Sequence, residues 1–236
     1  MSVDTTAVFF DLAIAVGTRL EFERRCLREP LIDESTIVRF AAEYLAARWP
    51  GEIRPNEPHP ELSGKFIDLV GIRPRSEKYD LGLEAKWLKA DSGTRQWLKE
   101  ITVDLFRLQH FKEDVVQDAE RILVVAGTSE KIKKEIFEKT VQTGGGTTQA
   151  MSYVLPSQIS STYKKFQIRN CDTEIRKWLL GCHEKIGKDI NLPSTYDARL
   201  AARYSSLTKS DEAIEVIVWR TKRPTGWGSF NPSREW

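Results

Sequence analysis

The chain has few cysteines, and their spacing does not form a zinc site. Its 236 residues contain only Cys26, Cys171 and Cys182, with no Cys-x-x-Cys pair. A cluster of Cys171, Cys182 and His183 would lack a fourth ligand at a suitable spacing, so we expect free thiols. Free thiols are typical of a reducing compartment, and we therefore expect a cytoplasmic protein.

The sequence also lacks a hydrophobic run long enough to cross a membrane. The apolar stretch from Val8 to Val16 is too short to span a bilayer and contains Asp11. No basic segment precedes it, so we expect no secretion signal and no membrane partner. We interpret the stretch as part of a buried helix over residues 5–29, which Pro30 ends.

Several common catalytic patterns are missing. There is no G-x-S-x-G sequence, and Gly144–Gly146 follows a predicted helix instead of the strand that a phosphate-binding loop requires. His59, His110 and His183 are scattered, and none lies beside a plausible serine or cysteine nucleophile. These absences argue against a serine or cysteine hydrolase and against a nucleotide-binding loop.

The net charge is small. At +2, with a pI near 8.4, the chain has no overall basic character. A surface that binds nucleic acid must therefore be a local patch of basic residues.

Two apolar, strand-like segments carry charged residues. KFIDLVGI contains Asp68, and DLGLEAKWL contains Glu84 and Lys86. Because strand side chains alternate, Glu84 and Lys86 share a face and Ala85 points the other way. The turn-forming residues between the segments predict an antiparallel hairpin, which would place Asp68 beside Glu84.

A carboxylate in an apolar strand is costly unless it is paired or binds a metal. Mg²⁺ prefers oxygen ligands and keeps several waters, so two protein carboxylates can suffice. A structural ion pair between Lys86 and one carboxylate is the alternative interpretation. In a metal site, burial and the nearby cation would lower the pKa of Lys86 toward that of a general base.

Asp68 with the Glu84-Ala85-Lys86 triplet resembles the motif of the PD-(D/E)xK nuclease superfamily, although Ile67 stands where many members have proline. Over about residues 31–142, the predicted order of helix, three strands, helix and strand resembles the αβββαβ core of that superfamily. The resemblance implies an α/β, restriction-endonuclease-like fold with a mixed central sheet flanked by helices.

The resemblance also implies roles for individual residues. Asp68, Glu84 and the Ala85 carbonyl would hold Mg²⁺, for which Mn²⁺ can substitute, and Lys86 would position or deprotonate the attacking water. A glutamate from the first core helix completes the metal shell in many members. We favour Glu34, which precedes Ile37 and Ala41 on the apolar face of its helix, over Glu43 nearer the polar flank. A role for Glu34 only in the first helical turn is an equal alternative.

For contact with substrate phosphates, the basic residues around the motif are the candidates. These are Lys89, Arg95 and Lys99. The helix that follows often supplies a further polar contact in that superfamily, and Gln96, Lys99 and Arg107 are the candidates on its different faces. A surface ion pair of Asp104 with Arg107 is the alternative.

The remaining segments predict an N-terminal helix (1–30), the nuclease-like core (31–150) and a C-terminal extension packed on it (151–236). We expect Asp33 to cap the core helix over 33–49 and Ser129 to cap a helix over 129–142. We further expect a helix over 95–114, a buried strand over 121–128, a short strand within 151–159, a helix over 171–187, and a hairpin of residues 199–207 and 212–223.

The combined prediction is a Mg²⁺-dependent endonuclease acting on DNA, with RNA as an open possibility, in restriction, defence or repair. Cutting both strands would need two active sites, so a homodimer is plausible. One alternative is a non-catalytic module for nucleic-acid binding or assembly that retains the fold. Another is a metal-dependent phosphohydrolase acting on small nucleotides.

Overall fold

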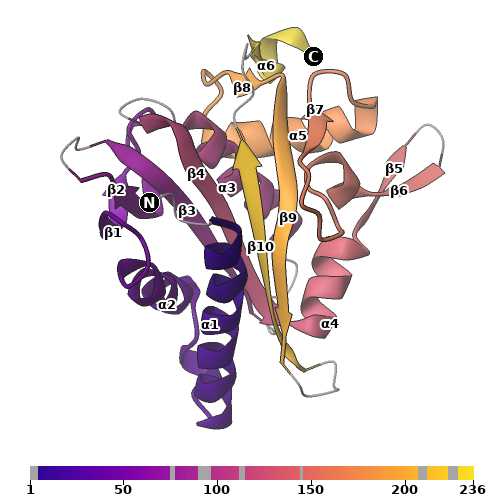
Figure 1. The fold of residues 1–236 in the computed structure, drawn as a ribbon. Coiled ribbons are helices and arrows are strands. Elements are labelled where there is room, and N and C mark those ends of the chain that lie inside the picture. Colours follow the sequence, from indigo (N-terminus) through magenta and orange to yellow (C-terminus); the bar gives the residue numbers. More distant parts are fainter. Residues whose placement is uncertain are drawn as a thin grey trace.

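The computed structural model describes residues 5–74, 78–89, 97–111, 115–143, 146–206, 212–222 and 228–236. Within these residues the chain forms a seven-stranded sheet with helices on both faces (Figure 1). The strand order is β1 (Glu52–Pro58), β2 (Phe66–Ile72), β3 (Tyr79–Leu88), β4 (Val115–Thr128), β10 (Ile214–Lys222), β9 (Thr195–Ser205) and β7 (Lys164–Gln167). The pair β3 and β4 is parallel, and the other neighbours in this sheet are antiparallel. The predicted α/β class with a mixed sheet between helices is therefore confirmed.

The first half of the chain contains the predicted order of a helix, three strands, a helix and a strand. Its elements are α1 (Thr5–Arg25), the 3-10 turn η1 (Glu29–Leu31), α2 (Glu34–Ala46), β1 (Glu52–Pro58), β2 (Phe66–Ile72), β3 (Tyr79–Leu88), α3 (Trp97–His110) and β4 (Val115–Thr128).

The second half extends the same sheet. Its elements are α4 (Ser129–Ile132), the π-helical turn η2 (Lys133–Phe137), β5 (Thr140–Thr143), β6 (Gly146–Gln149), η3 (Ala150–Tyr153), β7 (Lys164–Gln167), α5 (Thr173–Ile186), β8 (Leu192–Pro193), β9 (Thr195–Ser205), β10 (Ile214–Lys222), β11 (Ser229–Phe230) and α6 (Pro232–Glu235). Since β10 pairs with β4 along its length, the C-terminal third continues the sheet of the first half.

Several local predictions are correct. Asp33 caps α2, because its Oδ1 accepts a hydrogen bond from the Thr36 amide at 2.9 Å. The segments after residue 195 form the expected antiparallel pair, β9 and β10. The predicted tip of this hairpin lies outside the described residues, as does the expected helix start at Asp91–Thr94.

Other local predictions are wrong. The helix expected over 129–142 is capped by Thr128 instead of Ser129, ends at Phe137, and is followed by the β5–β6 hairpin. The segment expected to hold a strand within 151–159 begins with the 3-10 turn η3. Polar residues such as Thr140 and Gln142 form β5 without the apolar alternation on which the prediction depended.

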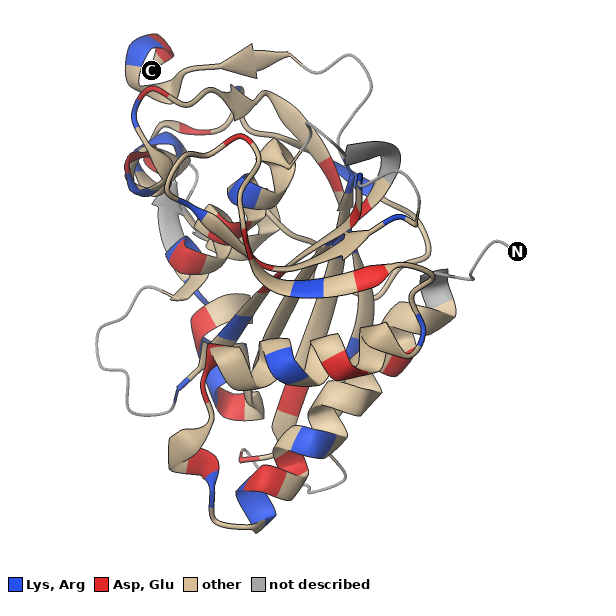
Figure 2. Cartoon of the chain, turned by 90° about the vertical axis from the view of Figure 1, so that its left-hand side faces the viewer, with Lys and Arg blue, Asp and Glu red and all other residues tan. Residues whose placement is uncertain are grey.

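Helix α1 buries only one side, although apolar residues lie on both. Phe9, Leu12 and Val16 are fully buried, whereas Phe10 and Ile14 are 50% and 39% exposed. Among the described residues, no helix has both the length and the apolarity to cross a bilayer. Viewed from the β1 edge, acidic and basic residues are interspersed and neither sign covers that side alone (Figure 2).

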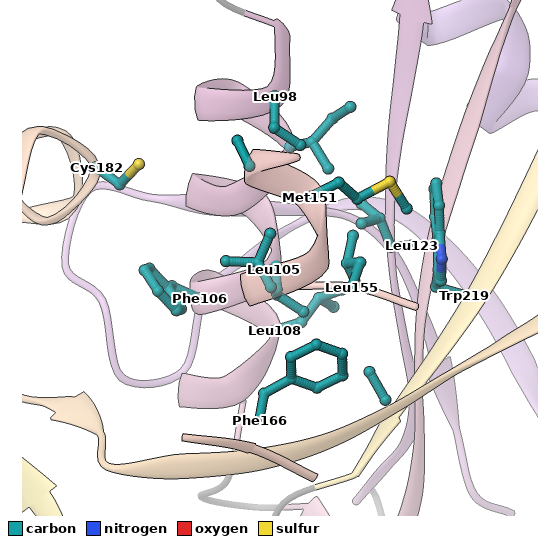
Figure 3. Close-up of a cluster of buried hydrophobic side chains, with 14 of the residues drawn as sticks. Leu98, Leu105, Phe106, Leu108, Leu123, Met151, Leu155, Phe166, Cys182 and Trp219 are labelled. Atoms are coloured by element: carbon teal, nitrogen blue, oxygen red, sulfur yellow. The ribbon is translucent and has the colours of Figure 1, made fainter. Parts of the chain in front are cut away.

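The sheet separates two hydrophobic cores. On one face, α1 and α2 pack on residues of the central strands that include Leu83, Ala85 and Val124. On the other face, α3 packs on the sheet in a core that includes Leu123 and Trp219, and α5 packs on the far side of α3 (Figure 3). Strand β3 contributes to both cores and is buried from Asp80 to Leu88. A polar side chain on β3 is therefore inside the protein.

Gly17 explains how closely α1 approaches the sheet. Glycine in a helix interior costs about 1 kcal/mol relative to alanine, so its presence needs a reason. A Cβ atom at Gly17 would overlap the ring of Tyr204 on β9. The absence of a side chain thus permits the contact between α1 and β9.

We expect Gly17→Ala to destabilise the protein by about 1–3 kcal/mol, because the overlap with Tyr204 outweighs the gain in helix propensity. Urea unfolding followed by circular dichroism measures the change. Thr18→Ala, at an exposed position of the same helix, is the control and should have little effect. A Gly17→Ala variant as stable as the control would contradict this account of the packing.

Candidate active site

The hydrogen-bonded ladder between β2 and β3 ends at the motif residues. The last paired residues toward this end are Leu69 and Leu83, and the same register places Asp68 opposite Glu84. Past this point the Asp68 side chain takes the place of a backbone partner on β2. Its Oδ2 accepts a hydrogen bond from the Ala85 amide at 2.7 Å. The predicted hairpin is therefore present, and it brings the two carboxylates together.

The Ala85 carbonyl faces the same gap. In a strand the N–H and C=O of one residue point to the same side. Since the Ala85 amide bonds Asp68 on β2, its carbonyl also points toward β2, beyond the last paired residues. The structure thus gathers three of the predicted metal ligands, Asp68, Glu84 and Ala85, at the end of one ladder.

Glu84 is 1% exposed and lies among other acidic groups. Burial raises the pKa of Glu84 well above its ordinary value, and the neighbouring carboxylates of Asp68 and Asp104 raise it further. The guanidinium of Arg107 partly opposes this effect, with its Nη2 lying 3.1 Å from Glu84 Oε1.

Lys86 is also buried, and it is paired with two carboxylates. Its Nζ lies 3.0 Å from Asp104 Oδ2 and 3.3 Å from Glu34 Oε2. Burial alone would lower the pKa of Lys86, but these two carboxylates outweigh it, and the pKa lies above its ordinary value. In this arrangement Lys86 is therefore a charged ammonium, and a lowered pKa beside a bound cation stays a prediction.

Two residues of α3, Asp104 and Arg107, belong to this cluster, so the alternative of a surface ion pair is wrong. Asp104 is 4% exposed, and its Oδ1 lies 3.1 Å from Arg107 Nη1. Burial raises the pKa of Asp104 to about 6, against the opposing effect of Lys86 and Arg107. The signal that could have found Asp104 is its helical spacing from Ile101 and Leu108, both buried, which puts it on the apolar face of α3.

Glu34 rather than Glu43 is beside the motif. Glu34 is the first residue of α2, contacts Lys86, and has a side chain that is 39% exposed. Glu43 instead pairs with Arg19 at 3.4 Å on the protein surface. The cluster therefore reaches solvent on the side of Glu34.

The predicted phosphate-binding residues do not all lie together. Lys89 is exposed and lines a hollow of about 600 Å³ beside Glu34, with Trp87 also in its wall. Lys99 points away, because its ammonium lies against Gly181 of α5. Arg95 and Gln96 lie outside the described residues.

His59 contacts the backbone of α3 at Arg107, one of the residues of the cluster. Its Nδ1 accepts hydrogen bonds from the amides of Glu61 and Leu62, each at 3.1 Å, so its Nε2 carries the proton and donates to the Arg107 carbonyl at 3.0 Å. This connection ties the loop after β1 to α3. Burial lowers the pKa of His59 to about 4, so the ring is neutral at neutral pH.

The donor set fits a hard divalent cation in its chemistry. All the candidate ligands are oxygen atoms, and four carboxylates face only two cationic side chains among the described residues. Glu84 Oε1 and Asp104 Oδ2 are buried with ionic neighbours but without a well-directed hydrogen bond. The described residues do not, however, contain three acidic, histidine or cysteine groups already gathered as a metal site. Cation binding would therefore require a local rearrangement.

The cysteines form no comparable cluster. All three are free thiols, as expected. His183 is buried and bonds the Ile190 carbonyl and the Ser233 hydroxyl, which accounts for both ring nitrogens.

Comparison with known proteins identifies no relative: no family model matches the chain, and neither a curated protein nor a solved structure shows a significant match.

We expect His59 to make stability depend on pH. Its pKa in the folded protein, about 4, is below the value of about 6.5 in the unfolded chain. Its contribution is therefore complete above pH 6.5 and is lost as the pH falls toward 4, by up to about 1.4 kcal/mol per pH unit.

His59→Asn isolates this effect, because Asn can still accept from the Glu61 and Leu62 amides but does not titrate. Urea unfolding at a series of pH values measures both proteins. The stability advantage of the wild type over the variant should narrow between pH 6.5 and 4. A constant difference would mean that His59 is not held neutral.

Proposed function

We propose that the protein is a Mg²⁺-dependent nuclease of the PD-(D/E)xK superfamily that hydrolyses phosphodiester bonds in DNA. The observation that carries the proposal is the position of Asp68 opposite Glu84 where the β2–β3 ladder ends, with Lys86 on the same face of β3. The order α2-β1-β2-β3-α3-β4 supports it, since it is the order of the core in that superfamily.

Asp68, Glu84 and the Ala85 carbonyl would hold the cation, with Glu34 at the solvent side. When bound, Mg²⁺ polarises the phosphate, activates water and neutralises charge on the leaving oxygen. The buried carboxylates supply the negative charge that such a cation requires.

Lys86 has an electrostatic role in this scheme. As an ammonium it can hold the attacking water or a phosphate oxygen by charge-assisted hydrogen bonds. Its contacts with Asp104 and Glu34 fix the position of the ammonium group, since both carboxylates come from helices packed beside β3. Lys86 therefore positions and stabilises, instead of serving as the proton acceptor.

The substrate would approach past Glu34. The hollow lined by Lys89 and Trp87 opens there, and its basic residue can contact a phosphate next to the one that is cut. Because the net charge is only +2, binding would rely on such local contacts. The biological setting would be restriction, defence or repair, and cleavage of both strands would require a second copy of the chain.

We expect Lys86→Ala to reduce Mg²⁺- or Mn²⁺-dependent cleavage of DNA by about 100-fold or more, because a cationic group aimed at the reacting phosphate is lost. Plasmid nicking and single-stranded oligonucleotide cleavage measure the rate, and a parallel RNA substrate tests the choice of nucleic acid. Asp68→Asn should abolish cleavage by weakening cation binding.

Lys99→Ala is the matched control, since this lysine lies on the face of α3 that meets α5. It should retain wild-type activity. DNA binding without cleavage by the wild type would instead favour a non-catalytic binding module. Hydrolysis of free nucleotides alone would favour a small-molecule phosphohydrolase.

A further inference from the structure

Arg107 occupies the centre of the carboxylate cluster. Its Nη2 lies 3.1 Å from Glu84 Oε1 and also donates to the Phe66 carbonyl on β2, while its Nη1 lies 3.1 Å from Asp104 Oδ1. One guanidinium thus bridges β2, β3 and α3 at the point where the β2–β3 ladder ends.

The guanidinium and a divalent cation would compete for the Glu84 carboxylate. A Mg²⁺ ion bound to a carboxylate lies about 2.0–2.1 Å from its oxygen. With Arg107 Nη2 already 3.1 Å from Glu84 Oε1, two positive charges would come close together in a buried place. Their repulsion is little screened there, so both cannot keep Glu84.

The rest of the contacts allow Arg107 to leave Glu84 without becoming isolated. Its side chain is 18% exposed, and Asp104 remains as an acceptor on its own helix, one turn away. The guanidinium can therefore release Glu84, keep the contact with Asp104, and stay beside the site.

We propose that Arg107 is the internal counter-ion of the metal-free site and is exchanged for the divalent cation at Glu84. The inference rests on the proposed nuclease function and adds a step that regulates it. The cation must displace the Arg107 guanidinium from Glu84 before the site is complete. Arg107 is then a residue that sets metal affinity, and the released guanidinium lies where it can contact a substrate phosphate.

The test is Mn²⁺ binding in the absence of DNA, measured by titration calorimetry and by electron paramagnetic resonance of free Mn²⁺. Arg107→Gln removes the competing charge, so it should bind Mn²⁺ about tenfold more tightly than the wild type. Arg107→Lys retains the charge and should stay close to the wild type. Glu84→Gln should weaken binding in either background, and the gain from Arg107→Gln should disappear with it.

Arg169→Gln is the matched control, because it makes the same substitution at an exposed arginine paired with Glu235. It should leave the affinity unchanged. Equal or weaker binding by Arg107→Gln overturns the inference while leaving the nuclease proposal intact. Failure of both the wild type and Arg107→Gln to bind Mn²⁺ overturns both.

A second measurement covers the case in which Arg107→Gln does not fold. In wild-type protein labelled with ¹⁵N-arginine, the Arg107 Nε resonance, assigned with Arg107→Lys, should shift as Mg²⁺ saturates the site. An unchanged resonance at saturating Mg²⁺ would mean that Arg107 keeps its contacts. The proposal that the cation replaces Arg107 at Glu84 would then be wrong.

Discussion

Charge balance on a strand that is buried on both faces is the constraint on which this structure depends. Strand β3 lies between β2 and β4 and contributes to both cores, yet it carries Glu84 and Lys86. Charges taken out of water are costly unless they are paired with good geometry. The partners come from elsewhere in the chain: Asp104 and Arg107 from α3, and Glu34 from the start of α2. The packing of both helices is thus tied to the charges of one strand.

The pairing between β2 and β3 ends before the motif residues, which leaves space for these charges. Strand β2 continues to pair with β1 as far as Phe66, but its pairing with β3 stops at Leu69. In the gap, the Asp68 side chain satisfies the Ala85 amide, and Arg107 bonds the Phe66 carbonyl. Side chains thereby replace the missing backbone partners, which buried backbone groups require. The same gap leaves the Asp68 and Glu84 carboxylates next to each other.

The sequence predicted what depends on neighbours along the chain. The alternation in β3 put Glu84 and Lys86 on one face, and Asp33 marked the start of α2. It could not predict the partners of Lys86, because these depend on which face of α3 meets the sheet. That is why neither the raised pKa of Lys86 nor the burial of Asp104 followed from the sequence.

The short strands after residue 139 were missed for a different reason. Strands β5 and β6 are polar and rich in threonine, glutamine and glycine, so they carry no alternating apolar pattern. They form because their residues pair with each other as antiparallel strands. By contrast, β9 and β10 have apolar side chains in both cores, and their pairing was predictable.

A purely structural explanation of the cluster is the main alternative to a cation site, and the balance of charge argues against it. Buried ion pairs contribute little to stability, and evolution can replace them by apolar residues of similar volume without loss. Where a buried cluster serves only to hold elements together, its positive and negative charges should match. Here Asp68, Glu84, Asp104 and Glu34 outnumber Lys86 and Arg107. Burial raises the pKa of Glu84 and of Asp104, and the Asp68 carboxylate raises both further, which costs stability at neutral pH. A cation that binds there would remove this cost, which is the physical reason to interpret the cluster as a site.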